Sequence, residues 1–281
     1  MKSQPDTALE QNLIINKADI LFGQGDLDGA IDQYQKLISL NPEKGTYARA
    51  LEQIGRIYEL KHDTSRAKAY YEQILSDFPT ADNAPRAALG LGIAYTSSKQ
   101  FSNAVKILQG FDKQYPGSAL IPEAQYRLGL AYLMMPNREK TKGQFESVIA
   151  QYQLDIFAER SRMALAQIYT DEKEFKSAID TLNAIVNRRN DDIAAEALIM
   201  MGNNYLFSKH FIDALQAYKD VITQYTDFPL LIERAHLGAG SAYEKLRDRK
   251  HARLEYQEIL KKPIDANVRK EADARLKRIK R

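Results

Sequence analysis

A helical sequence pattern recurs about every 37 residues along the chain. Each copy places a small residue between apolar side chains, as in IGRIY at 54–58, LGIAY at 91–95 and LGLAY at 128–132. The small residues that mark the copies are Ala18, Gly55, Gly92, Gly129, Ala166, Gly202 and Gly240. Their spacings of 36 to 38 residues indicate an array of repeated helical units, each of which buries its apolar face against its neighbours.

A second small residue follows each of these positions by twelve residues, and large apolar side chains follow it by four and by seven. The second small residues are Ala30, Ala67, Ala104, Thr141, Ala178, Ala214 and Ala252. This periodicity predicts two helices in each unit, A and then B, joined by a polar turn such as SSKQ at 97–100. We expect Gly92 to be tolerated inside helix A because a side chain there would push Ala104 away.

These features resemble the tetratricopeptide repeat pattern from about Leu9 to Pro263. The resemblance implies an all-α fold, a right-handed superhelical α-solenoid of antiparallel helix pairs. The chain departs from the pattern because its period exceeds the common 34 residues and the bulky aromatic residue near the start of helix A is missing. The tandem array is expected over 1–263, with units near 11–44, 48–81, 85–118, 122–155, 159–192, 195–228 and 233–263.

A basic segment, 264–281, follows the array. From Lys261 to Arg281 there are nine basic residues against three acidic ones, whereas the rest of the chain has 31 basic and 34 acidic residues. With Asp265 as its N-cap, this segment is predicted to form a capping helix with a solvated outer face. Its apolar stripe is Val268, Ala272, Leu276 and Ile279. The alternative is a contact with an anionic nucleic acid or lipid surface through Lys277, Arg278, Lys280 and Arg281.

The residue types that most often carry chemistry are sparse. The chain has no cysteine, which excludes disulfides and thiolate metal sites, and its four histidines include no pair three or four residues apart. No glycine-rich phosphate loop, nucleophile elbow, H-E-x-x-H motif or EF-hand occurs. We therefore expect a protein that is not an enzyme and that holds no cofactor and no metal.

The resemblance places partner-binding side chains on the A helices, along the inner wall of the superhelix. At these positions the second unit is charged, whereas units three to six are largely apolar and include two amides. The expected groove residues are Leu89, Ile93, Tyr126, Leu130, Leu133, Met134, Met163, Gln167, Ile199, Asn203, Leu206 and Phe207. Such a channel suits an extended segment or an amphipathic helix of a partner protein.

Three functional hypotheses remain open from the sequence. The first is a non-catalytic protein–protein interaction scaffold that binds a partner segment in the groove. The second is a homo-oligomeric structural scaffold, and the third is an adaptor that binds nucleic acid or a membrane surface through the basic helix. Tetratricopeptide modules that grip a C-terminal carboxylate have Lys and Asn on early A helices, where this chain has Ile15 and Asp19, so that subtype is not supported.

The joints between units narrow the resemblance. Segments such as FPTADNAPRA at 78–87 and YPGSALIPEA at 115–124 are similar to those of bacterial cell-envelope proteins of the Tol-Pal coordinator and outer-membrane assembly lipoprotein type. That resemblance implies protein assembly in the periplasm or at the envelope if a signal has been removed, and otherwise in the cytoplasm. The first ten residues lack the apolar core of a secretory signal, and no apolar run is long enough to predict a transmembrane helix.

Overall fold

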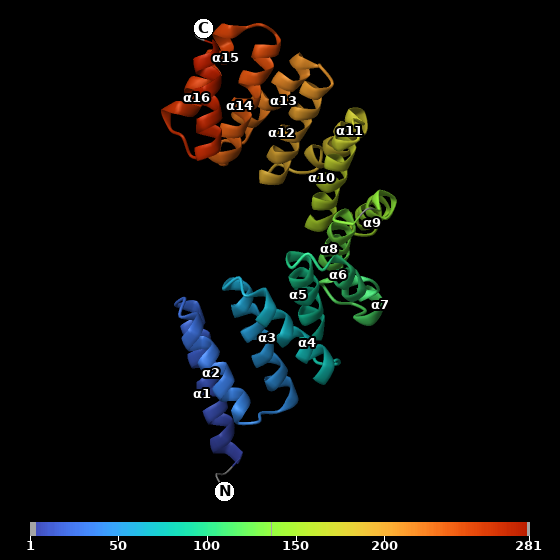
Figure 1. Cartoon of the computed structure of the whole chain (residues 1–281), viewed down its shortest axis with the longest axis vertical. Coiled ribbons are helices and arrows are strands. Elements are labelled where there is room, and N and C mark those ends of the chain that lie inside the picture. Colours follow the sequence, from blue (N-terminus) through green and yellow to red (C-terminus); the bar gives the residue numbers. More distant parts are fainter. Residues whose placement is uncertain (1–3, 136, 280–281) are drawn as a thin grey trace. The chain divides into compact units, whose positions relative to one another are not determined.

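The computed structural model describes residues 4–135 and 137–279 and is helical throughout (Figure 1). These ranges contain sixteen helices and no strand. The helices are α1 (Gln4–Gly23), α2 (Leu27–Ser39), α3 (Lys44–Leu60), α4 (Thr64–Asp77), α5 (Ala84–Ser97), α6 (Phe101–Leu108), α7 (Phe111–Gln114), α8 (Ile121–Leu133), α9 (Arg138–Gln151), α10 (Ile156–Asp171), α11 (Phe175–Val186), α12 (Asp192–Phe207), α13 (Phe211–Gln224), α14 (Pro229–Lys245), α15 (Arg249–Lys261) and α16 (Ala266–Ile279). From α1 to α6 and from α10 to α16, consecutive helices pack against each other. This packing, with the all-helical element order, confirms the predicted all-α solenoid of helix pairs.

The chain forms two compact units, Met1–Gln144 and Phe145–Arg281. In the first unit, one core cluster joins α1 to α5 and a second joins α5 to α8. In the second unit, one cluster joins α10 to α14 and another joins α14 to α16. Each unit therefore has its own apolar core, built by stacking one helix pair on the next.

The turn between helices A and B repeats one backbone geometry. A residue with positive φ occupies the same repeat position at Gly25, His62, Lys99, Lys173, Lys209 and Arg247. The next residue caps helix B, and the carboxylates of Asp26, Asp63 and Asp248 accept hydrogen bonds from backbone N–H groups in the first turn. A cap of this kind stabilises a helix by about 1 kcal/mol. The same local signals therefore reverse the chain direction in successive units.

Gly90 and Gly92 lie within α5, and each faces a large side chain on a B helix. A Cβ atom at Gly92 would lie 2.7 Å from Leu108 of the same unit, and one at Gly90 would lie 2.7 Å from Tyr71 of the preceding unit. The prediction that Gly92 makes room for Ala104 is therefore wrong, because the side chain next to Gly92 is that of Leu108. Leu108 fills the space because it lies one helical turn beyond Ala104 on the same face of α6.

Helix B of the third pair is shorter than the pattern predicts. α6 ends at Leu108 and α7 begins at Phe111, and between them Gly110 has a φ of 78°. Glycine adopts this left-handed conformation without a steric cost. The break leaves Phe111 fully buried, with its ring centroid 4.9 Å from that of Tyr115.

Candidate functional site

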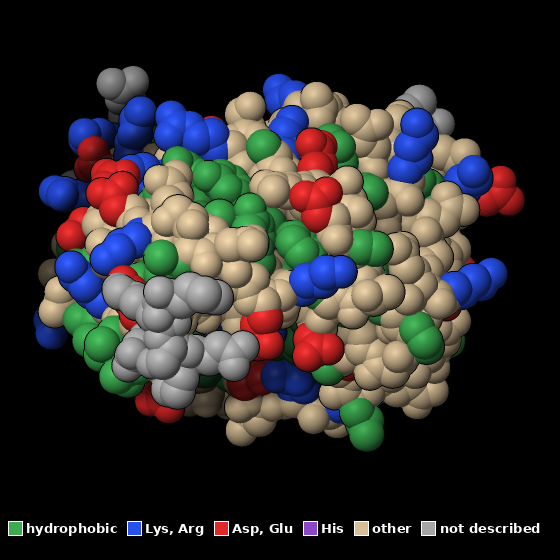
Figure 2. All heavy atoms as spheres, turned by 90° about the horizontal axis from the view of Figure 1, so that it is seen from below, with side chains coloured by type: hydrophobic (Ala, Val, Ile, Leu, Met, Phe, Trp, Pro, Cys, Tyr) green, Lys and Arg blue, Asp and Glu red, His purple; other side chains and the backbone are tan. Residues whose placement is uncertain are grey.

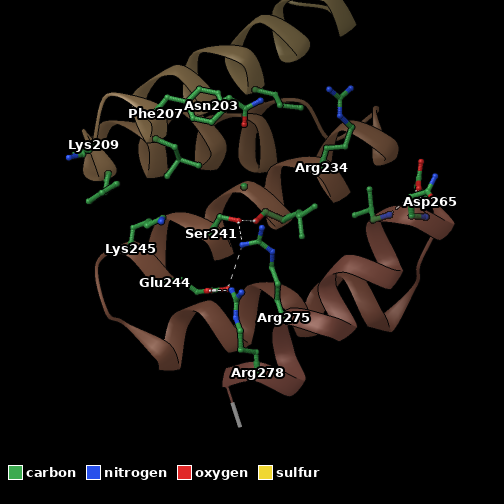
Figure 3. A pocket seen from close by; sticks show the side chains of 17 residues that line it. Asn203, Phe207, Lys209, Arg234, Ser241, Glu244, Lys245, Asp265, Arg275 and Arg278 are labelled. Carbon is green, nitrogen blue, oxygen red and sulfur yellow. Dashed lines mark hydrogen bonds and ion pairs between the residues drawn. The ribbon is translucent and has the colours of Figure 1, made fainter. Parts of the chain in front are cut away.

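The second compact unit, Phe145–Arg281, contains a pocket of about 1050 Å³ on its A-type helices (Figure 3). Side chains of α12, α14 and α16 line it, together with Lys209 in the turn before α13 and Phe211, the first residue of α13. Four of the expected groove residues lie in its wall: Ile199, Asn203, Leu206 and Phe207. The structure therefore gathers the part of the expected groove that α12 carries.

The repeat register explains why these positions meet. Ser241 on α14 follows Asn203 on α12 by 38 residues, and Arg275 on α16 follows Ser241 by 34. Residues one repeat apart occupy equivalent places on successive A helices, so their side chains form one wall. α16 thus lies where the A helix of a further unit would lie.

An apolar surface forms part of the pocket. Its members are Ile199, Leu206, Phe207, Phe211, Leu237 and Val268. Phe207 is 60% exposed, and its ring centroid lies 6.0 Å from that of Phe175 on α11. An exposed aromatic ring held by a neighbour can bury a large apolar area against a partner at little cost in conformational entropy.

Glu244 is the centre of a hydrogen-bonded network on one wall (Figure 3). The Tyr256 hydroxyl donates to Glu244 Oε1 at 2.6 Å, and Arg278 donates to Glu244 Oε2 at 2.6 Å. Arg275 donates to Ser241 Oγ at 2.9 Å and lies 3.7 Å from Glu244. Burial, together with the hydrogen bond to Glu244, raises the pKa of Tyr256 to about 12, so its phenol remains a donor at neutral pH. The network neutralises Glu244 and fixes both arginines at the pocket wall.

Cations outnumber carboxylates around the pocket. The lining basic residues are Lys209, Arg234, Lys245, Arg275 and Arg278, and the acidic ones are Glu244 and Asp265. Arg234 pairs with Glu196 at 3.2 Å, and Asp265 accepts the backbone N–H of Asn267 at 2.7 Å. In the described ranges no ion pair holds Lys209 or Lys245. These two ammonium groups can therefore bind an anionic group of a partner.

Asn203 lines the pocket from α12, near Phe207 (Figure 3). The buried Tyr218 hydroxyl donates to Asn203 Oδ1 at 2.7 Å, and burial raises the pKa of this phenol. Because its oxygen is occupied, the amide orientation is fixed and the NH₂ group can donate to a bound peptide carbonyl.

The other expected groove residues lie outside this pocket. Leu89 is buried in a core cluster of the first compact unit, so its side chain contributes to packing. Gln167 is exposed on α10 and donates to Asp171 Oδ1 at 2.9 Å, and Met134 is exposed beside a hollow of about 350 Å³. The half-buried members are Ile93, Tyr126, Leu130, Leu133 and Met163. A groove that continues from the first compact unit into the second stays a prediction.

The basic residues of α16 are largely engaged within the chain. Lys277 pairs with Asp273 at 2.6 Å and Arg278 pairs with Glu244, whereas Lys280 and Arg281 lie outside the described residues. On the face of the molecule that Figure 2 shows, basic and acidic side chains are interspersed. Arg275 lines the pocket but is not among the residues predicted from the sequence. The 34-residue spacing from Ser241 would have indicated it if α16 had been considered as an A-type helix.

In residues 4–135 and 137–279, no three side chains of His, Cys, Asp or Glu gather in a way that could hold a metal ion. No helix in those ranges combines the length and the apolar composition needed to cross a bilayer.

Comparisons with known proteins agree with this geometry. Tetratricopeptide repeat models match residues 9–80, 52–119 and 123–153. A tetratricopeptide repeat protein from Parabacteroides merdae has a similar structure, with a TM-score of 0.63 at 15% identity, over 96% of this chain and 99% of that chain. The C-terminal part of a TPR repeat-containing protein from Cytophaga hutchinsonii has a TM-score of 0.64 at 15% identity, over 92% and 98%.

PilW, a type IV pilus biogenesis factor, is also similar, with a TM-score of 0.59 at 14% identity, over 80% of this chain and 97% of that chain. A search of curated proteins by sequence finds no match. At these identities the structural likeness shows the fold alone. The tetratricopeptide repeats support a protein-interaction scaffold. The chain belongs to the tetratricopeptide repeat family.

Proposed function

We propose that this protein is a non-catalytic interaction scaffold and that the pocket between α12, α14 and α16 binds a segment of a partner protein. One observation carries the proposal: the exposed ring of Phe207 lies in a pocket that also contains the ammonium groups of Lys209 and Lys245, which no ion pair in the described ranges holds. A concave site that combines apolar surface with a few polar groups is typical of ligand-binding pockets.

The lining chemistry defines the segment that fits. An apolar side chain of the bound segment lies against Phe207 and Leu206. A carboxylate next to it in the same segment pairs with Lys209 or Lys245. The Asn203 amide donates to a backbone carbonyl of the same segment. An extended peptide or an amphipathic helix with an acidic residue beside an apolar one meets these requirements.

The setting of this function is a further part of the proposal. The array comprises residues 1–263, with 264–281 as its cap, and the protein serves protein assembly in the periplasm or envelope of a bacterium. One observation supports that setting: the joints at 78–87 and 115–124 are similar to those of bacterial cell-envelope proteins.

Photo-crosslinking in the source cell tests the proposal. The photoreactive residue p-benzoylphenylalanine replaces Phe207, and the matched control replaces Ile212, which is 66% exposed on α13 and does not line the pocket. We expect one partner to be trapped from position 207 and not from position 212. The trapped segment is then synthesised, and its binding to the purified protein is measured by calorimetry.

Phe207→Ala should weaken that binding about thirtyfold, as expected for an aromatic hot spot worth about 2 kcal/mol. Ile212→Ala should leave the dissociation constant unchanged. Equal trapping from both positions, or a dissociation constant that Phe207→Ala does not alter, would contradict the proposal.

A further inference from the structure

The first compact unit, Met1–Gln144, contains a second pocket, of about 660 Å³. The first turns of α3 and α5 line it, together with the joint before α5 and the joint before α8. Its charged members are Glu43, Arg49, Glu52, Asp82 and Arg86. This pocket shares no residue with the one between α12, α14 and α16, and its charged lining indicates a ligand held by ion pairs.

Arg49 and Arg86 occupy equivalent places on successive A helices, each six residues before the small residue that marks its copy. In the second compact unit the same places on α12 and α14 carry Glu196 and Arg234. Those two side chains form an ion pair with an N–O distance of 3.2 Å. Helices α3 and α5 contact each other directly, as α12 and α14 do. Side chains at this place therefore converge, and in the first compact unit both of them are cations.

The pocket is held in shape by contacts between α3 and the start of α5. Glu52 on α3 is 2% exposed and lies 3.2 Å from the Arg86 guanidinium. Asn83, directly before α5, donates to the backbone carbonyl of Ala48 at 2.8 Å. Arg86 remains 60% exposed, so its other N–H groups are open to an anion. Arg49 is also exposed, and in the described ranges no ion pair holds it.

The carboxylates of the pocket restrict which anion fits. Three of them line it against two guanidinium groups, so a phosphate dianion, a nucleic acid or an anionic membrane would be repelled. A single carboxylate adds only one charge and can bridge both arginines. Glu43 and Asp82 are exposed, and no ion pair in the described part of the chain holds either one. Basic residues beside the bound carboxylate would supply their partners.

We propose that this pocket is a second binding site and that it takes an acidic side chain flanked by basic residues in a segment of a partner protein. The carboxylate bridges the guanidinium groups of Arg49 and Arg86, in place of the internal pair that Glu196 and Arg234 form. The flanking ammonium groups pair with Glu43 and Asp82. The pocket around Phe207 selects an apolar residue beside an acidic one, so the two sites bind different segments.

Nuclear magnetic resonance of the arginine Nε–Hε groups tests the site at constant ionic strength. The probe is the tripeptide Lys-Glu-Lys, acetylated and amidated so that its only carboxylate is that of the side chain. We expect it to shift the signals of Arg49 and Arg86 saturably, whereas the matched tripeptide Lys-Gln-Lys and inorganic phosphate should not. No saturable shift with Lys-Glu-Lys, an equal one with Lys-Gln-Lys, or a saturable one with phosphate overturns the proposal.

A substitution that supplies the carboxylate from within the chain gives the second test. Arg49→Glu copies the arrangement of Glu196 and Arg234 and should weaken tripeptide binding about tenfold or more. Arg253→Glu, at an exposed arginine on α15 that lines neither pocket, is the matched control and should bind as the wild type does. Circular dichroism verifies that both variants are folded. An Arg49→Glu variant with unchanged affinity overturns the proposal. Phe207→Ala should leave tripeptide binding unaltered, so the two sites succeed or fail separately.

Discussion

The ring of Tyr71 lies between two glycines, Gly55 on the A helix of its own unit and Gly90 on the next A helix. A Cβ atom at either position would lie within 2.8 Å of the ring. The Tyr71 hydroxyl is hydrogen-bonded with Glu59, so the ring is fixed at its far end as well. A glycine inside a helix costs about 1 kcal/mol relative to alanine. That cost is offset because the missing side chains let one aromatic ring join two units.

Gly90→Ala should lower the free energy of unfolding by about 1–3 kcal/mol, the usual effect of overpacking a core. Urea unfolding followed by circular dichroism measures this change. The matched control is Gly143→Ala on α9, where no atom lies within 4 Å of the added Cβ and the glycine is exposed. The control should gain up to about 1 kcal/mol from helix propensity. A Gly90→Ala variant as stable as the wild type would contradict this packing argument.

The need for small residues on helix A could be predicted from the sequence, but their packing partners could not. Spacing alone does not distinguish Ala104 from Leu108 as the neighbour of Gly92, because both lie on the same face of α6. Which of the two side chains contacts Gly92 depends on how closely the two helices pack, and this distance is a property of the packed pair.

Helix α16 is fixed at its start by a buried carboxylate. Glu233 on α14 is 5% exposed and accepts the backbone N–H groups of Ile264 at 3.1 Å and Asp265 at 2.9 Å. Towards the other end of the helix, Arg278 pairs with Glu244. α16 is therefore held by two acidic side chains of α14 as well as by its own apolar stripe.

Glu233→Gln should loosen α16, because the amide can accept only through its single oxygen and loses the charge. Hydrogen bonds to charged groups contribute about 1.5–3 kcal/mol, so amide exchange in residues 266–279 should accelerate about tenfold or more. Hydrogen exchange followed by mass spectrometry measures this rate. Glu258→Gln, which removes an exposed pair with Lys261, should leave the rate unchanged. Equal exchange in both variants would show that the apolar stripe alone holds α16.

Across the whole chain, we expect the stability of each helix to depend mainly on the helices beside it in the array. Each core cluster involves helices that are close in sequence, and the two compact units have separate clusters. In such an array the free energy is approximately a sum of unit and nearest-neighbour contributions. A substitution should therefore act mainly on the units beside it.

Leu182→Ala removes a fully buried side chain of α11 and should cost about 2–5 kcal/mol. Amide exchange should accelerate in α10, α11 and α12 and stay unchanged in α1 to α4. The exposed Leu254→Ala on α15 is the control and should change neither region. Faster exchange throughout the chain of the Leu182→Ala variant would indicate one cooperative fold instead.

The sequence by itself determined the helical repeat and its register, whereas the side of each A helix on which binding residues were to be sought was implied by the resemblance to tetratricopeptide repeats. The sequence could do so because every unit repeats the same local packing, and the residues that make it recur at a fixed spacing. The tertiary structure decided which of those positions form a pocket, and it placed Arg275 and Arg278 of α16 in the pocket wall. Those outcomes depend on the contacts of Glu233 with Ile264 and Asp265 and of Glu244 with Arg278. The repeat pattern alone could not predict these contacts, because their partners lie in the segment that follows the last repeat.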